Sequence, residues 1–229
     1  MIQEICYGST STLNKEKLDF NLRNKIKIRS SDKIVMLVGA PDGLERHYQN
    51  VLAWGGSIEN LFIIDICKET IDKLKEFHHS FLSHKYPTPK FIKSDLNEFL
   101  EKWEFGKIGV IDFDGTTGLS KYHLNTVSIA DSLGCEYLII VAPSRVQNEE
   151  ILALAKDLPK VKRRIYETVE DQIARKGYST VSGQITKWCE PTAVNKFNHH
   201  VSSELGHELI AFESYYGVSP MTLSAFKLY

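Results

Sequence analysis

The feature that most constrains the fold is a regular alternation of short apolar runs with longer stretches of helical periodicity. Residues 33–39 (KIVMLVG) form a continuous apolar run, as expected of a strand buried on both faces. A Gly/Pro turn then leads into residues 44–54, whose apolar spacing is near 3.6. This alternation indicates right-handed crossovers and a parallel sheet. The further expected strands are 60–66, 90–96, 107–114 and 136–142, and the further expected helices are 68–85, 97–103 and 122–133.

The rhythm changes after the fifth expected strand. Residues 148–158 and 161–176 are expected as helices, and residues 177–206 are polar and poorly periodic. Residues 208–216 and 221–228 are β-rich runs joined by a Gly/Pro turn, which is typical of an antiparallel hairpin. The sequence therefore predicts an α/β fold with a doubly wound, mostly parallel seven-stranded sheet and an antiparallel C-terminal strand.

Composition indicates one soluble globular domain. The chain has 229 residues, of which 42% are hydrophobic and 25% charged, enough to bury a sizeable core. The formal net charge of -1 argues against binding nucleic acid through bulk charge. We expect a single domain with four parts, a helical lead-in at 1–32, a ligand-binding half at 33–146, a helical insert at 147–207 and a β-hairpin at 208–229.

Cysteine spacing and the amino terminus indicate where the protein resides. The four cysteines are scattered and form no Cys-x-x-Cys pair, so we expect reduced thiols and no zinc site. The first residues lack the basic start and apolar run of a signal peptide, and no apolar stretch is long enough to cross a bilayer. We expect a cytoplasmic protein with no membrane partner.

Acidic residues and glycines stand where the expected strands end. In an open parallel sheet, ligands bind beyond the carboxyl ends of the strands. The sequence therefore predicts a ligand site built from these residues. They are Gly39 and Gly43 after the first strand, Asp65 after the second, Asp95 after the third, and Asp112 and Asp114 at the end of the fourth.

The glycine loop, residues 39–44 (GAPDGL), differs from a dinucleotide-binding loop. Pro41 and Leu44 occupy the second and third glycine positions of the Gly-x-Gly-x-x-Gly pattern. The second glycine lets a pyrophosphate approach the backbone, so its loss argues against NAD or FAD. A nucleoside without phosphates needs only a tight turn and a spot free of side chains, which Gly39 and Gly43 offer. A plain strand-to-helix turn is the structural alternative.

Two of the acids have both a functional and a structural interpretation. Asp65 lies a little over 20 residues after the glycine loop, where an acid commonly accepts hydrogen bonds from ribose hydroxyls. Asp95 is placed to accept from an adenine amino group, with Leu96 packing on the ring. Each carboxylate is equally suited to cap the helix that follows it. The sequence leaves both interpretations open.

The arrangement resembles the class I S-adenosylmethionine-dependent methyltransferases, over roughly residues 33–142 and again in the terminal hairpin. The sequence departs from that family in having Leu37 where an acid is usual and Pro41 as the central loop residue. The resemblance implies S-adenosylmethionine as the cofactor. It implies Gly39, Ala40 and Gly43 under the methionine part, Asp65 at the ribose, Ile66, Asp95 and Leu96 at the adenine, and Asp112 and Asp114 facing the methyl acceptor.

The chemistry of the acceptor is less defined. Asp112 and Asp114 lie two apart on a strand and so share one face, where they can bind a metal, share a proton or hold an amine. Magnesium-dependent O-methyltransferases carry an Asp-Asn pair after the fifth strand, which residues 142–145 (APSR) lack, so we expect no metal. Asp114 is the candidate proton acceptor, with capping of the following turn as its structural alternative.

We expect the acceptor to be an amine of a nucleic acid or nucleotide, because an acid ends the fourth strand and basic residues gather in 160–176. The structural alternative for the basic residues is a solvated helix face. A small-molecule acceptor is the first alternative. A methyltransferase-like module without catalytic activity, acting as a binding subunit, is the second. Self-association into a homo-oligomer stays open.

Overall fold

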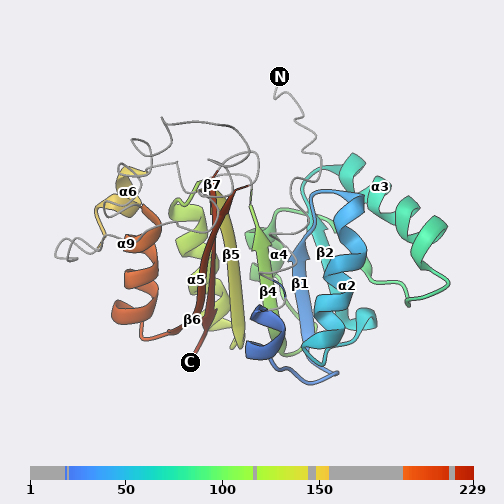
Figure 1. Ribbon diagram of the computed structural model, residues 1–229, viewed down its shortest axis with the longest axis horizontal. Helices are drawn as coiled ribbons and strands as arrows, with labels where there is room; N and C mark the ends of the chain where they lie inside the picture. The colour runs from blue at the N-terminus through green and yellow to red at the C-terminus, as the bar shows by residue number, and fades with distance from the viewer. Residues whose placement is uncertain (1–18, 20, 116–117, 144–147, 155–192, 217–219) are drawn as a thin grey trace, which may run out of the picture.

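Seven strands form one sheet in the part of the chain that the computed structural model describes, residues 19, 21–115, 118–143, 148–154, 193–216 and 220–229. Their order is β3-β2-β1-β4-β5-β7-β6 (Figure 1). Strands β1 to β5 pair in parallel, and β7 is antiparallel to both β5 and β6. This confirms the predicted sheet. The strands are β1 (Lys33–Leu37), β2 (Leu61–Asp65), β3 (Lys90–Lys93), β4 (Ile108–Asp114), β5 (Tyr137–Pro143), β6 (Glu208–Tyr216) and β7 (Pro220–Lys227).

Helices cover both faces of the sheet, as expected for a doubly wound fold (Figure 1). The helices are α2 (Leu44–Ala53), α3 (Lys68–Phe77), α4 (Leu96–Glu101), α5 (Lys121–Ser132), α6 (Glu149–Leu152) and α9 (Ala193–His199), with short turns η1 (Pro41–Gly43), η2 (Ile58–Asn60), η3 (His78–Leu82) and η4 (His200–Glu204). Neighbouring residues of a strand point to opposite faces, so Ile34 and Met36 join the core under α2 and α3 whereas Val35 joins the core under α4, α5 and α9.

The strand order reverses between β1 and β4. Strands β2 and β3 extend from one side of β1, and β4 and β5 extend from the other. The crossovers therefore leave in opposite directions from this point, and a crevice at the carboxyl ends of these strands is where such sheets bind ligands. Asp65 ends β2 and Asp95 follows β3 on one side of this point, and Asp112 and Asp114 belong to β4 on the other.

Some element boundaries differ from those expected. The expected strand at 90–96 ends at Lys93 because Asp95 is the N-cap of α4. The segment 177–206, expected to be irregular, contains α9 and the π-turn η4. Residues 21–25 of the lead-in are helical. Some expected features lie outside the described residues. They are the helix at 161–176, the part of the helix at 148–158 that follows residue 154, and Cys6 and Cys189.

Three polar side chains form a hydrogen-bonded series at the π-turn η3, which ends α3. The Tyr48 hydroxyl lies 3.1 Å from His78 Nδ1, and His78 Nε2 lies 3.2 Å from the Thr88 hydroxyl. Burial is the main cause that lowers the pKa of His78. A π-turn widens a helix by one residue per turn, and here it places the imidazole between α2 and the loop before β3.

None of the described helices combines the length and apolar character needed to cross a membrane.

Candidate functional site

The acids of β2 and β3 lie next to one another at the carboxyl edge of the sheet. Asp65 is in register with Lys93, and the Ser94 N–H donates to the Asp65 carbonyl oxygen at 3.0 Å. Asp95 is therefore the second residue beyond this last rung of the ladder. The two acids predicted to bind one nucleoside therefore stand where adjacent strands end, at the same edge of the sheet.

The glycine loop is a 3-10 turn with open space above its first glycine. Ala40 has an extended backbone, Pro41 begins η1, and the Gly43 N–H donates to the Ala40 carbonyl at 3.3 Å. Pro41 suits this place because its fixed φ matches the first position of a helical turn. A Cβ added to Gly39 meets no atom within 4 Å, and one added to Gly43 comes no closer than 3.8 Å to His47. Nothing in the described protein fills the space at Gly39.

Asp65 is half-buried and already holds one hydrogen bond. Its Oδ1 accepts from the Cys67 N–H at 2.7 Å. Burial raises the pKa of this carboxyl, and the Cys67 N–H partly opposes that shift. Cys67, rather than Asp65, occupies the N-cap of α3. Ile66 beside it is 70% exposed, so an apolar surface adjoins the carboxylate at this edge.

Asp95 caps α4, as one of its two interpretations required. Its Oδ1 accepts from the Glu98 N–H at 3.1 Å, and the Tyr122 hydroxyl donates to the same carboxylate, 3.0 Å from Oδ1 and 2.9 Å from Oδ2. Leu96 is only 3% exposed and belongs to the core under α4 and α5. The contact of Asp95 and Leu96 with an adenine stays a prediction.

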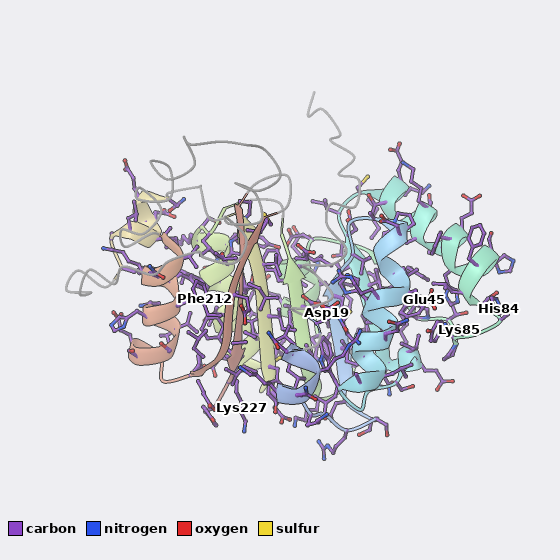
Figure 2. The ribbon with its side chains drawn as sticks, viewed as in Figure 1. Asp19, Glu45, His84, Lys85, Phe212 and Lys227 are labelled. Atoms are coloured by element: carbon purple, nitrogen blue, oxygen red, sulfur yellow. The ribbon has the colours of Figure 1, made fainter. Side chains whose placement is uncertain are left out.

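Asp112 and Asp114 face α2, where a buried polar cluster joins the N-terminal segment to β4. Asp112 is 7% exposed, and its Oδ2 lies 3.7 Å from His47 Nδ1. Arg46 pairs with Asp19 at 2.8 Å and lies 3.3 Å from His47 Nε2. Asp19 is labelled beside α2 in Figure 2. A guanidinium only donates, so His47 Nε2 accepts, and the neutral ring then carries its proton on Nδ1 towards Asp112.

A small cavity of about 30 Å³ lies within this cluster. Such a volume holds about one or two water molecules and is far below the size of a nucleoside. A ligand of nucleoside size does not fit on this side of β4. The lining residues are Asp19, Leu22, Arg46, His47, Asn50, Trp54, Asp112, Asp114, Ile139, Val141 and Leu223.

On the opposite face of β4, a buried histidine lies in the first turn of α5. The His123 ring stacks on Phe113 with centroids 4.6 Å apart and planes 7° apart, and its Nδ1 accepts from the Ser120 N–H at 3.2 Å. Burial lowers the pKa of His123 to about 4. A Cβ on Gly115 would lie 2.9 Å from Phe113 Cε2, so the chain needs glycine there.

Sequence reasoning missed several residues of this site, and the signal for some of them was present. Arg46 and His47 are polar residues within the first turn of an otherwise apolar-patterned helix, directly after the glycine loop. His123 and Tyr122 begin α5 behind Ser120, where a capping residue marks the helix start. Asp19 carried no local signal, since its partner Arg46 is distant in sequence.

The described residues contain no group of three His, Cys, Asp or Glu side chains placed to hold a metal ion.

Comparison with known proteins was made on sequence and on structure. No family model and no curated protein sequence matches the chain. Solved structures do match it. M. capricolum TrmK in complex with S-adenosyl-homocysteine has a TM-score of 0.52 at 10% identity, covering 96% of this chain and 69% of that one. The chain has the class I S-adenosylmethionine-dependent methyltransferase fold. A putative RNA methyltransferase from Pyrococcus horikoshii shares this methyltransferase fold with a TM-score of 0.50 at 14% identity, covering 96% of this chain and 85% of that one.

A third protein with the methyltransferase fold is magnesium protoporphyrin IX methyltransferase (ChlM) from Synechocystis PCC 6803 with bound S-adenosyl-homocysteine. Its TM-score is 0.50 at 10% identity, and the match covers 97% of this chain and 90% of that one. Identities this low show a common methyltransferase fold, whereas function has to be argued from the site.

Proposed function

We propose that this protein transfers a methyl group from S-adenosylmethionine to an amine of a nucleic acid or nucleotide. The observation that carries the proposal is the adjacency of Asp65 and Asp95 at the carboxyl edge of β2 and β3. The open space at Gly39 and the two acids of β4 lie at the ends of the next strands in the sheet. Two of the similar structures, TrmK and ChlM, are complexes with S-adenosyl-homocysteine.

The residues at this edge suit the parts of the cofactor. Asp65 has acceptor capacity beyond the Cys67 N–H, because a carboxylate offers about four lone-pair sites, and ribose hydroxyls would donate there. Gly39, Ala40 and Gly43 would lie under the methionine part. Ile66 and Leu96 would adjoin the adenine, with Asp95 at its amino group.

When bound, S-adenosylmethionine supplies a methyl group activated by the sulfonium. Asp114 would orient the acceptor amine and take the proton that the nitrogen loses as its new bond to carbon forms. Asp112 lies deeper in the sheet and faces His47 instead of the outer end of β4. Asp112 would therefore not touch the acceptor amine itself.

The acceptor class has support of two kinds. A carboxylate at the end of β4 accepts hydrogen bonds from an N–H donor, which favours an amine. Matching structures include an RNA methyltransferase and a dimethyladenosine transferase by name. A small-molecule acceptor is the alternative, since ChlM methylates a porphyrin by name. A non-catalytic module is the other, because Leu37 stands where the family usually has an acid and packs against the core.

Titration calorimetry with S-adenosyl-homocysteine tests the proposal. We expect the native protein to bind with a micromolar Kd and Asp65→Ala to weaken binding by about 10- to 100-fold, since hydrogen bonds to a charged group contribute about 1.5–3 kcal/mol. Asp72→Ala is the control, because Asp72 is exposed on α3. Absence of binding by the native protein at millimolar ligand would favour the non-catalytic module.

The affinity should also depend on pH through Asp65. Only the ionised carboxylate accepts from both hydroxyls, so binding is full above the pKa of Asp65 and weakens as the pH falls through it. Burial raises this pKa above the ordinary value of 3.8, so the weakening starts at a higher pH than for a solvated aspartate. Calorimetry of the native protein and of Asp65→Asn between pH 7 and pH 4 measures this. Parallel pH profiles in the two proteins would contradict the role of Asp65.

A further inference from the structure

Tyr122 connects the start of α5 to the carboxylate that caps α4. Its hydroxyl lies 2.9 Å from Asp95 Oδ2 and 3.0 Å from Oδ1. The two residues are 27 positions apart in sequence, and they meet because α4 and α5 pack side by side on one face of the sheet. This contact ties the first turn of α5 to the N-cap of α4, directly after β3.

The direction of the Tyr122 O–H bond is set by its other contacts. The Asn97 N–H donates to the hydroxyl oxygen at 3.2 Å, so the oxygen acts there as an acceptor and its proton turns to Asp95. Asn97 Nδ2 also donates to the Tyr122 carbonyl at 3.2 Å, and the Thr126 hydroxyl donates to Asn97 Oδ1 at 2.8 Å. Burial raises the pKa of Tyr122 to about 12, so the phenol stays a donor at neutral pH.

The Asp95 carboxylate keeps acceptor capacity despite these bonds. Oδ1 receives the Glu98 N–H, and both oxygens share the single Tyr122 proton. A carboxylate has about four lone-pair sites, so at least one remains, and the bond at Oδ1 leaves it on Oδ2. Asp95 can therefore cap α4 and bind a further donor at the same time, whereas the sequence presented these as two separate interpretations.

We propose that Tyr122 is a positioning residue that holds the Asp95 carboxylate with Oδ2 towards the adenine amino group. This inference rests on the proposed function, and it adds that selection of adenine over other purines depends on a residue of α5. Without the hydroxyl, Asp95 would still cap α4 through Oδ1, but its carboxylate would be free to rotate away from the base.

The test compares two ligands that differ at the purine 6-position. S-inosylhomocysteine carries an oxygen where S-adenosyl-homocysteine carries the amino group, so it presents an acceptor to Asp95. We expect the native protein to prefer the adenosyl ligand by about tenfold or more, as a lost hydrogen bond to a charged group implies. In Tyr122→Phe the preference should fall to about threefold or less, with adenosyl affinity reduced about five- to tenfold.

Control variants separate positioning from folding. Tyr86→Phe removes a hydroxyl that bonds Glu45 at 3.3 Å, away from Asp95, and should keep the native preference. In an Asp95→Asn background, Tyr122→Phe should change the preference no further, because both act through one carboxylate. Melting temperatures of all variants report stability separately from the preference.

Three outcomes would overturn the inference. A native preference retained by Tyr122→Phe shows that the hydroxyl has only a structural role. A native protein that binds both ligands equally shows that Asp95 does not read the 6-position, while leaving the proposed function standing. A native protein that binds neither ligand shows that the proposed function is wrong, and this inference with it.

Discussion

The Phe197→Ala variant is expected to lose about 3–5 kcal/mol of its free energy of unfolding, the usual cost of truncating a fully buried phenylalanine. Phe197 is 0% exposed and packs against Phe226 of β7, with ring centroids 6.3 Å apart and planes at 68°. It attaches α9 to the sheet together with Ala193, Val194 and Val201. The expected loss is large because a packed core relaxes only partially around the cavity that the truncation leaves.

Urea unfolding followed by circular dichroism measures this loss. Phe81→Ala is the matched control, because Phe81 on η3 is 61% exposed and its truncation should cost about 1 kcal/mol or less. Equal unfolding free energies in the two variants would show that α9 does not contribute to the core of the fold. A change in the slope of unfolding free energy against urea concentration would show instead that α9 alone has detached.

The free energy of unfolding is expected to fall as the pH is lowered from about 6.5 to about 4, through His123. Burial lowers the pKa of this imidazole from 6.5 to about 4 in the folded protein. Between these values the unfolded chain binds a proton that the folded protein excludes, so stability is full above pH 6.5 and declines until pH 4. The pKa difference corresponds to about 3 kcal/mol. His78 adds a change of the same sign, because its pKa is also lowered.

The His123→Phe variant isolates this contribution. A phenyl ring keeps the stacking on Phe113 but cannot titrate, so the variant should lose less stability between pH 6.5 and pH 4 than the native protein. Denaturant unfolding at several pH values measures the free energy of unfolding of both proteins. Subtracting one pH profile from the other removes the effect of the carboxylates, which the two proteins share. His79→Gln is the control, because His79 is exposed, and it should keep the native pH dependence. Equal pH dependence in native protein and His123→Phe would contradict a buried neutral His123.

Local periodicity was enough to place the strands of the sheet, and it failed where the pattern was short or weak. The run at 33–39 is apolar on both faces, as suits a central strand that helices cover on both sides. The helix α9 lies in the predicted helical insert, but its bounds were not predicted because its seven residues include His and Asn side chains beside the apolar ones. Its apolar positions 193, 194, 197 and 201 do follow helical spacing, but the pattern becomes informative only against a sheet that can receive it.

The two interpretations of Asp95 show where reasoning from the sequence stops. A residue type and its place before a helix predict both a cap and a ligand contact, since one carboxylate serves either purpose. The structure shows the cap and, in addition, the Tyr122 hydroxyl that orients the remaining oxygen. Tyr122 is 27 positions from Asp95 in the sequence, so a local sequence pattern does not contain both residues.

The sequence by itself determined the order and type of the main elements, the parallel sheet with its antiparallel end, and the acids at the strand termini. These follow from hydrophobic periodicity, which acts between residues close together in the chain. Only the tertiary structure decided that Asp65 and Asp95 share an edge, that Arg46 pairs with Asp19, and that Tyr122 reaches Asp95. Those contacts join residues more than 25 positions apart, and such contacts depend on how strands pair and helices pack rather than on any local preference.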